Sequence, residues 1–320
     1  MTALLLLALA GCSGPDAKPA ADAKTAADAK TAADVVSALQ PVRIALNWFP
    51  EPEFGGFYEA ALGDTYKKAG LDVTIIPGGP GVPVLEMLAS GQADVAISGA
   101  DDLLVKRAKG LDAVAVFSGF QDSPVGLMVH AESGLTTVAQ IQSGTVAIEA
   151  GSPFQQYLWT TQGWEGKVAM VPTTGGIGAF AADPKLIQQG YVTSEPCVAE
   201  GQGLNVNFIP SREFGWNPYA SLAVVRGSEK DAAWVKAFAD ASKAGWTDYI
   251  RDPTRADIEI NRLNPDLPLE RMACITRLQA AYVVGTDGLG AMTSARWKET
   301  ADALNKVGIA VVADGAWLKP

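Results

Sequence analysis

Aromatic side chains gather in a short segment near the start of the globular part of the chain. Trp48, Phe54, Phe57 and Tyr58 follow a β-branched run, and Glu51 stands between two prolines in the same segment. Aromatic faces stack on planar rings and attract cations, and each aromatic pair contributes about 1 kcal/mol. The segment therefore predicts an aromatic cage, with at least one of the four rings in the core instead. Glu51 either accepts hydrogen bonds from ring amino or imide groups or is a solvated loop carboxylate.

The residues that carry catalysis are scarce. The single histidine, His130, falls in a predicted strand, and no nucleophile motif accompanies it, so a Ser-His-Asp triad is not expected. The spacings Cys-x-x-Cys, His-Glu-x-x-His and Gly-x-x-x-x-Gly-Lys-Ser/Thr do not occur in the sequence. We therefore expect binding without turnover, and neither a metal nor a cofactor.

Composition excludes other classes of function. The formal net charge is −10, and phosphate binding needs the concentrated Lys and Arg that this chain lacks, so nucleic acid is not an expected partner. After residue 40 no long apolar run occurs, which indicates a soluble globular part of about 280 residues without a membrane span.

The N-terminus indicates export. Residues 3–10 are apolar, and Leu9-Ala10-Gly11-Cys12 resembles the lipobox of bacterial lipoproteins, in which the cysteine is lipidated and becomes the mature N-terminus. The alternative is an ordinary signal peptide, because no Lys or Arg precedes Cys12. We predict a signal peptide at 1–12 and a lipid anchor at Cys12 that holds the protein on a bacterial membrane, facing the periplasm or the cell exterior.

Residues 13–40 are predicted to be a disordered tether. Ala, Asp, Lys, Thr and Pro dominate this stretch, and the sequence of Ala21–Ala26 recurs at Ala27–Ala32. Such a segment has too few apolar side chains to offset the entropy of ordering.

Beyond the tether, strands and helices alternate. This order predicts right-handed crossovers and a mainly parallel sheet, followed by a helical C-terminal part. The predicted strands are 42–46, 71–76, 93–98, 113–117, 124–130, 145–149, 168–172, 191–193, 206–209 and 220–225; the predicted helices are 57–69, 82–90, 101–109, 153–162, 180–189, 229–250, 254–261, 269–284 and 291–306.

The ends of the strands predict the position of a binding crevice. In parallel sheets ligands collect beyond the carboxyl ends of the strands, where helix N-termini also point. Trp48 follows the first strand, Ser98 ends the third, and Ser152 follows the first strand of the second α/β unit. We expect these three residues to face one crevice. Ser152 either caps its own helix or helps to bind an anion or a carbonyl group.

Residues 47–60 resemble a known signature, that of the thiamine-pyrimidine-precursor binding family of ABC importer substrate-binding proteins. Trp48, Pro50, Gly56, Tyr58 and Ala60 stand at the matching offsets. Further matches are Ala69–Val73, Gly91–Ile97 and Gly190–Pro196, and together they extend over about 41–300.

The resemblance implies an α/β, two-lobed periplasmic-binding-protein fold of type II-like organisation, with two hinge crossings and a ligand cleft between the lobes. The large lobe is then expected at 41–132 and 218–320, the small lobe at 144–212, and the hinges at 133–143 and 213–217. The implied function is to capture a small planar heterocycle by closure of the lobes and to deliver it, as a monomer, to an ABC permease.

The resemblance also implies the site. We expect Phe57 in the core, and Trp216 either closing the cage or packing beneath it. The predicted ligand-binding residues are Asn47, Trp48, Glu51, Phe54, Tyr58, Ser98, Ser152, Tyr191, Glu195 and Trp216.

Two departures from the family pattern change the expected ligand. Glu51 and Phe54 replace an asparagine and a histidine of the pyrimidine binders, which favours a larger or more apolar planar ring, such as a flavin. The alternatives are a binder of sulfonate or nitrate-type anions, an enzyme similar to the fungal pyrimidine synthase, and a structural or signalling lipoprotein. The synthase requires the histidine that Phe54 replaces and a cysteine-rich motif that this chain lacks.

Two cysteines remain after Cys12. In an oxidising compartment Cys197 and Cys274 either pair or stay as buried thiols, and the sequence leaves both alternatives open. Because they are expected in different lobes, a bond would pin the lobes together. This argues against pairing unless both cysteines lie near the hinge.

The lipid anchor is testable by one substitution. Cys12→Ser is expected to move the protein into the soluble exported fraction and to leave its fold intact, because the tether contributes nothing to the core. Cell fractionation followed by circular dichroism of the released protein measures both effects. Unchanged membrane association of the variant would contradict the lipobox assignment.

Overall fold

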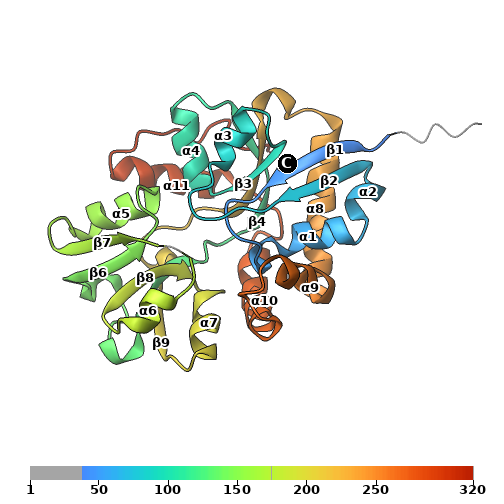
Figure 1. Ribbon diagram of the computed structural model, residues 1–320. Helices are drawn as coiled ribbons and strands as arrows, with labels where there is room; N and C mark the ends of the chain where they lie inside the picture. The colour runs from blue at the N-terminus through green and yellow to red at the C-terminus, as the bar shows by residue number, and fades with distance from the viewer. Residues whose placement is uncertain (1–37, 174, 320) are drawn as a thin grey trace, which may run out of the picture. The chain divides into compact units, whose positions relative to one another are not determined.

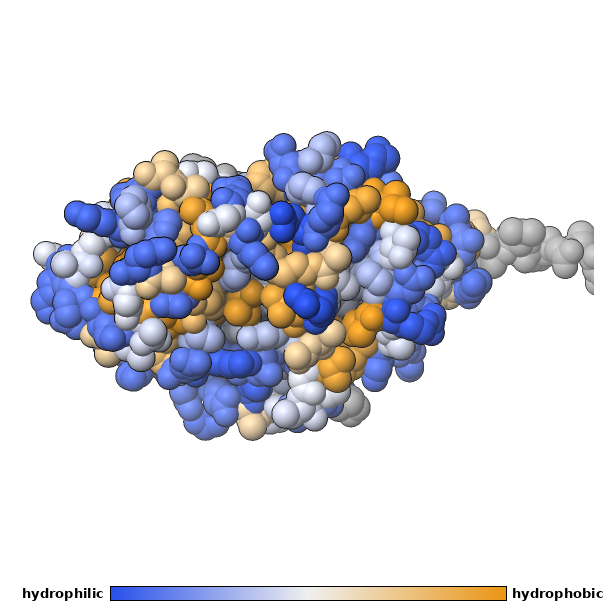
Figure 2. Space-filling model, turned by 90° about the horizontal axis from the view of Figure 1, so that it is seen from below, coloured by the Kyte–Doolittle hydropathy of each residue, from blue (hydrophilic) through white to orange (hydrophobic). Residues whose placement is uncertain are grey.

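The computed structural model describes residues 38–173 and 175–319. The predicted signal peptide, Cys12 and the tether up to residue 37 lie outside the described residues. In the described part no helix is long and apolar enough to cross a membrane. Figure 2 shows one face of the molecule, on which hydrophobic residues form small groups among hydrophilic ones.

The first lobe is built on a five-stranded sheet in the order β2-β1-β3-β10-β4. Strands β1, β2 and β3 run parallel, and β10 is antiparallel to both β3 and β4. The bounds are β1 Gln40–Ala45, β2 Leu71–Ile76, β3 Val95–Ser98, β4 Ala113–Phe120 and β10 Ala220–Arg226.

Alternation along these strands puts helices on both faces of the sheet. Ile44 and Ile97 pack into one core cluster, whereas their neighbours Ala45 and Ala96 pack into the other, as the period of two of a strand requires. The first cluster is covered by α1 (Gly55–Leu62), α2 (Thr65–Lys68), α8 (Ala233–Arg251), α9 (Thr254–Leu263) and α10 (Leu269–Val284), and the second by α3 (Val84–Ala89), α4 (Ala100–Ala108) and α11 (Ser294–Lys306) (Figure 1).

The second lobe has its own five-stranded sheet in the order β7-β6-β8-β5-β9. Strand β6 is parallel to β7 and β8, and β5 is antiparallel to β8 and β9. Its elements are β5 (Val125–His130), β6 (Gly144–Ile148), α5 (Pro153–Gln162), β7 (Val168–Pro172), α6 (Gly178–Ala182), β8 (Leu186–Tyr191), α7 (Glu195–Gly201) and β9 (Val206–Pro210). Short 3₁₀ helices of both lobes are η1 (Pro52–Phe54), η2 (Ala131–Ser133), η3 (Val138–Gln140), η4 (Ser211–Phe214) and η5 (Gly227–Glu229).

The sheets correct two expectations. Both are mixed rather than mainly parallel, because β5 and β10, the strands that follow the two crossings, run against their neighbours. The predicted first hinge at 133–143 is wrong. Because β5 pairs with β8 and β9, residues 125–130 belong to the second lobe and the chain first crosses between β4 and β5, at 121–124. The second crossing lies between η4 and β10, at 215–219, and overlaps the predicted 213–217 only at 215–217.

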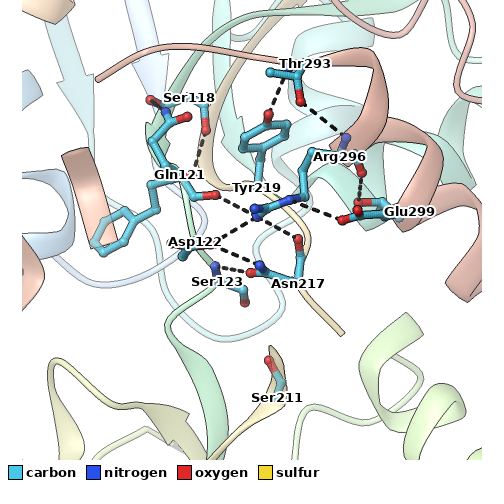
Figure 3. A network of polar contacts seen from close by, with 12 residues as sticks. Ser118, Gln121, Asp122, Ser123, Ser211, Asn217, Tyr219, Thr293, Arg296 and Glu299 are labelled. Atoms are coloured by element: carbon cyan, nitrogen blue, oxygen red, sulfur yellow. Dashed lines mark hydrogen bonds and ion pairs between the residues drawn. The ribbon is translucent and has the colours of Figure 1, made fainter. Parts of the chain in front are cut away.

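Arg296 of α11 connects the two crossings (Figure 3). Its guanidinium donates hydrogen bonds to Gln121 O at 2.9 Å and Asp122 Oδ1 at 3.2 Å in the first crossing, and to Asn217 O at 3.4 Å in the second. Asn217 also donates to Asp122 and accepts from the backbone N–H of Ser123. One side chain of the large lobe therefore holds both connecting segments together.

Two predicted helices are shorter than expected. The helix predicted at 57–69 is interrupted between α1 and α2, where Asp64 adopts a positive φ of 58°. The helix predicted at 180–189 ends at Ala182, because Asp183 precedes Pro184 and is therefore extended, with φ −125° and ψ 104°. Residues 186–191 form strand β8 instead.

Cys197 and Cys274 form a disulfide, which contradicts the argument against pairing. Cys197 lies on α7 and Cys274 on α10, and the two helices pack together across the lobes (Figure 1). Nothing in the sequence signals the contact between these two helices, and this contact is what allows the bond.

The contact between α1 and α8 depends on glycine. A Cβ atom added at Gly245 would meet the backbone oxygen of Gly56 and the Cβ of Ala60. Overpacking of this kind costs about 1–3 kcal/mol, so Gly245→Ala should lower the midpoint of urea unfolding. Lys243→Ala, exposed on the same helix, is the matched control and should leave the midpoint nearly unchanged. Equal midpoints for the two variants would contradict the close helix contact.

Candidate functional site

Three adjoining cavities lie between the two lobes, and Asn47 and Glu149 line all three. The largest, the wide cavity, has a volume of about 620 Å³ and extends between α3, α4 and the start of α5. The carboxylate cavity, of about 100 Å³, is lined by Glu51, Glu53 and Glu195. The hinge cavity, of about 90 Å³, reaches Trp216 beside the second crossing.

Eight of the ten predicted ligand-binding residues line these cavities. They come from both lobes, as expected for a cleft that closes on its ligand. The eight are Asn47, Trp48, Glu51, Ser98, Ser152, Tyr191, Glu195 and Trp216.

Phe54 and Tyr58 line none of the three cavities, so the structure does not support the prediction for these two residues. Phe54 is 0% exposed and Tyr58 is 4% exposed, and both pack in the core cluster of α1, α8 and α10. The reason is local, because η1 begins directly after Glu51 and α1 follows η1. The helical period then turns the rings of Phe54 and Tyr58 away from the cleft. Phe57 is in the core as predicted, against Phe117 and Trp246.

Trp48 is the aromatic side chain available for stacking. It is half-buried, and its ring meets Phe49 edge to face at a centroid distance of 5.6 Å. Gly175 of the opposite lobe lies against both rings, with the position of an added Cβ 3.6 Å from Trp48 Cζ2. The predicted cage is therefore reduced to three aromatic residues that line the cavities. Trp48 lines the wide and carboxylate cavities, Tyr191 lines the carboxylate and hinge cavities, and Trp216 lines the hinge cavity.

The carboxylate cavity brings acids of the two lobes together. Glu51 and Glu53 come from the large lobe, and Glu195 begins α7 of the small lobe. The Glu195 carboxylate accepts a 2.6 Å hydrogen bond from the backbone N–H of Tyr191, and Ser194 Oγ donates to Glu51 Oε2 at 3.3 Å, across the lobes. No hydrogen bond of the Glu53 carboxylate to a described residue accompanies these two.

These acids favour the protonated state when no ligand is bound. Burial raises the pKa of Glu51 to about 8, with a further contribution from the charge of Glu195. Burial also raises the pKa of Glu195 to about 7, although backbone N–H groups favour its charged form. The pKa of Glu53 lies well above its usual range, first through burial and then through repulsion by the other two acids. The carboxylate cavity therefore resists the charge that its residues would carry in water.

The sequence analysis missed a second group of acids in the cleft: Asp101 lines the hinge cavity, Asp102 lines the wide and hinge cavities, and Glu149 lines all three. Burial raises the pKa of Asp101 to about 6 and raises those of Asp102 and Glu149 as well. Asp101 follows β3 closely and Glu149 follows β6 directly. The rule that placed Ser98 and Ser152 at strand ends would have found both of them.

Basic residues are confined to one part of the cleft. Lys106 and Lys109 line the wide cavity, and Lys106 forms an ion pair with Glu86. No Lys or Arg among the described residues lines the carboxylate cavity or the hinge cavity. Within the same part of the chain, no group of three or more His, Cys, Asp or Glu is arranged to hold a metal ion.

Ser152 caps its own helix. Its hydroxyl oxygen accepts a hydrogen bond from Gln155 N at 3.2 Å, and Pro153 occupies the first helical position. The cap accounts for the hydrogen bond of the Ser152 hydroxyl within the protein. Ser152 also lines the wide and hinge cavities, and its contact with a ligand stays a prediction.

The raised pKa values predict how stability depends on pH. Each acid has a higher pKa in the folded state than its unfolded value near 4.5, so the folded protein binds more protons between the two values and its free energy of unfolding falls as pH rises. The loss should occur between about pH 4.5 and about pH 8. Glu51→Gln and Glu195→Gln should each flatten this fall in urea titrations of the ligand-free protein. The exposed Glu200→Gln on α7 should not, and equal slopes for all three variants would contradict the assigned burial.

Comparison with known proteins identifies the family. A family model described as NMT1/THI5 like matches residues 51–256. The formylaminopyrimidine-binding protein of Halalkalibacterium halodurans is 23% identical over 229 residues, which cover 68% of this chain and 69% of that protein. The riboflavin-binding protein RibY of Chloroflexus aurantiacus is 25% identical over 325 residues, which cover 96% and 91%.

Solved structures agree on the fold. The periplasmic aliphatic sulphonate binding protein SsuA from Escherichia coli superposes with a TM-score of 0.69 at 14% identity, covering 88% of this chain and 92% of that one. This likeness confirms the two-lobed α/β fold that the sequence predicted. Because the family model matches more than half of the chain, the protein belongs to the NMT1/THI5-like family.

Proposed function

We propose that this chain is the substrate-binding component of an ABC importer, and that its ligand is a small planar heterocycle that carries N–H donors or a positive charge. Membership of the NMT1/THI5-like family supports the binding role, as do relatives that are named for binding a formylaminopyrimidine and riboflavin. The proposal includes export, a lipid anchor at Cys12, a monomeric state and binding without catalysis.

One observation carries the ligand class: Glu51, Glu53 and Glu195 line the same cavity as Trp48, without a basic residue of the described chain among them. Buried carboxylates must be protonated or paired, because an isolated charge in a low dielectric is costly. A ring with N–H donors or a positive charge satisfies them, and the Trp48 indole stacks on its face. Anions gain nothing at this end of the cleft.

The wide cavity favours a second candidate, a sulfonate or nitrate-type anion. Lys106 and Lys109 supply positive charge there, and the N-terminus of α5 lies beside it. However, Lys106 is already paired with Glu86, and Asp102 and Glu149 line the same cavity. We therefore favour the heterocycle and reserve the wide cavity for its substituent.

The mechanism follows from the position of the acids. Glu51 and Glu195 belong to different lobes, so a ligand that donates hydrogen bonds to both connects the lobes and stabilises the closed arrangement. A ligand shifts this equilibrium only by its difference in affinity for the open and closed states. Recognition of the closed form by a permease then couples capture to import.

Calorimetry against a panel of ligands tests the class. Amino-substituted pyrimidines and flavins should bind, whereas taurine, an alkanesulfonate and nitrate should not. Trp48→Ala should weaken binding by about 1–3 kcal/mol through lost stacking and burial. Glu195→Gln should lower the affinity for a ligand that presents a donor or a positive charge to this acid.

Trp234→Ala, a half-buried tryptophan on α8, is the matched control and should leave the affinity unchanged. Tight binding of a sulfonate or nitrate that is insensitive to Trp48→Ala would contradict the proposal and place the ligand at the α5 end of the wide cavity.

A further inference from the structure

The lobes are connected at three places rather than two. Besides the crossings at 121–124 and between η4 and β10, the Cys197–Cys274 disulfide joins α7 of the small lobe to α10 of the large lobe. The Cα atoms of the two cysteines are 6.0 Å apart, and α7 lies beside α10 in Figure 1. A two-lobed binding protein that opens about its crossings alone needs no such bond.

Both partners of the bond are attached to the carboxylate cavity. Cys197 lies two residues after Glu195 on the same short helix, which also packs on the cores of both lobes. On the other side, Gln279 of α10 donates a 3.0 Å hydrogen bond to Pro52 O, between Glu51 and Glu53. The disulfide therefore holds together the two segments that bring Glu51, Glu53 and Glu195 into one cavity.

The same helix reaches the hinge. Tyr282 O, near the end of α10, accepts hydrogen bonds from the backbone N–H groups of Gln121 at 2.8 Å and Asp122 at 3.2 Å in the first crossing. Cys274 precedes Tyr282 by eight residues, or about 12 Å along a helix. The disulfide and the first crossing are two fixed attachments between the lobes, about 12 Å apart along α10. The lobes can therefore rotate relative to one another only about an axis that passes close to both attachments.

The opposite flank of the cleft is held differently. There α5 meets the end of α11, and Gln156 Nε2 donates a 3.1 Å hydrogen bond to Val307 O. Among the described residues, no covalent bond between the lobes lies on this side. The wide cavity opens here, lined by Gln156, Gly308 and Ile309.

We propose that the Cys197–Cys274 disulfide restricts opening at the carboxylate end of the cleft, so that the lobes part mainly at the flank of α5 and α11. The inference rests on the proposed function only in taking the cleft as the ligand site. In an oxidising compartment the bond persists, and the segments that carry Glu51 and Glu195 separate less than the flank of α5 and α11 when the lobes open. Reduction then converts a one-sided opening into a free one.

Hydrogen exchange of the full chain without ligand tests this proposal. In the oxidised protein, residues 304–309 and 152–158 should exchange faster than residues 191–197 and 51–55. Cys197→Ser/Cys274→Ser should accelerate exchange at 191–197 and 51–55 by about tenfold, and leave β5 at 125–130 unchanged. The wild-type protein reduced by a phosphine gives the same comparison without a substitution, should the double variant fail to fold.

Arg271→Ala is the matched control, because Arg271 packs against Gly201 in the same interface of α7 and α10 while the disulfide stays intact. It should leave exchange at 191–197 and 51–55 unchanged. Unchanged exchange of these segments after loss of the bond would overturn the proposal, and so would an equal acceleration of β5, which would assign the bond to global stability. Because no ligand is added, neither result depends on whether the proposed ligand class is correct.

Discussion

The gathering of acids from both lobes in one cavity is the constraint on which the arrangement of this protein depends. Glu51, Glu53 and Glu195 meet between the lobes, and burial is the largest cause of the raised pKa of each. Wherever these acids ionise, the lobes present like charges to one another, and other contacts must then hold them together. The Arg296 contacts at the crossings and the disulfide between α7 and α10 supply those contacts, and they belong to the scaffold rather than to the cleft.

The fold brings the acids together through ordinary α/β geometry. Glu51 follows β1, Asp101 follows β3 and Glu149 follows β6, so each stands beyond the carboxyl end of a strand. Two sheets that face each other with these ends create a cleft whose walls are loops and helix N-termini. A helix N-terminus stabilises a single carboxylate, and Asp101 and Asp102 stand in the first turn of α4. When several carboxylates share one enclosed space this stabilisation no longer suffices, and a ligand with a positive charge or hydrogen-bond donors is favoured.

The sequence predicted the fold better than the site. Strand ends located Trp48, Ser98 and Ser152 correctly, because the period of a strand and the edge at which it ends are local properties. Phe54 and Tyr58 were misplaced because the family pattern specifies offsets, whereas η1 and α1 decide which side of the chain faces the cleft. The first hinge was misplaced because the sequence of β5 carries no signal for the sheet to which the strand belongs. Only its pairing with β8 and β9 places β5 in the second lobe. The contact between α7 and α10, and with it the disulfide, involves residues 77 positions apart and has no local signal.

Glutamate at position 51 contributes more than one contact. An asparagine at this position would offer a donor and an acceptor and would leave the carboxylate cavity with one acid fewer. With glutamate, two acids from opposite lobes face one cavity, and the charge of Glu195 makes Glu51 harder to ionise. A ligand that brings a positive charge or two donors therefore satisfies an acid of each lobe at once. A neutral ring without donors gains only stacking on Trp48, so the acids select among planar ligands that the indole alone would accept.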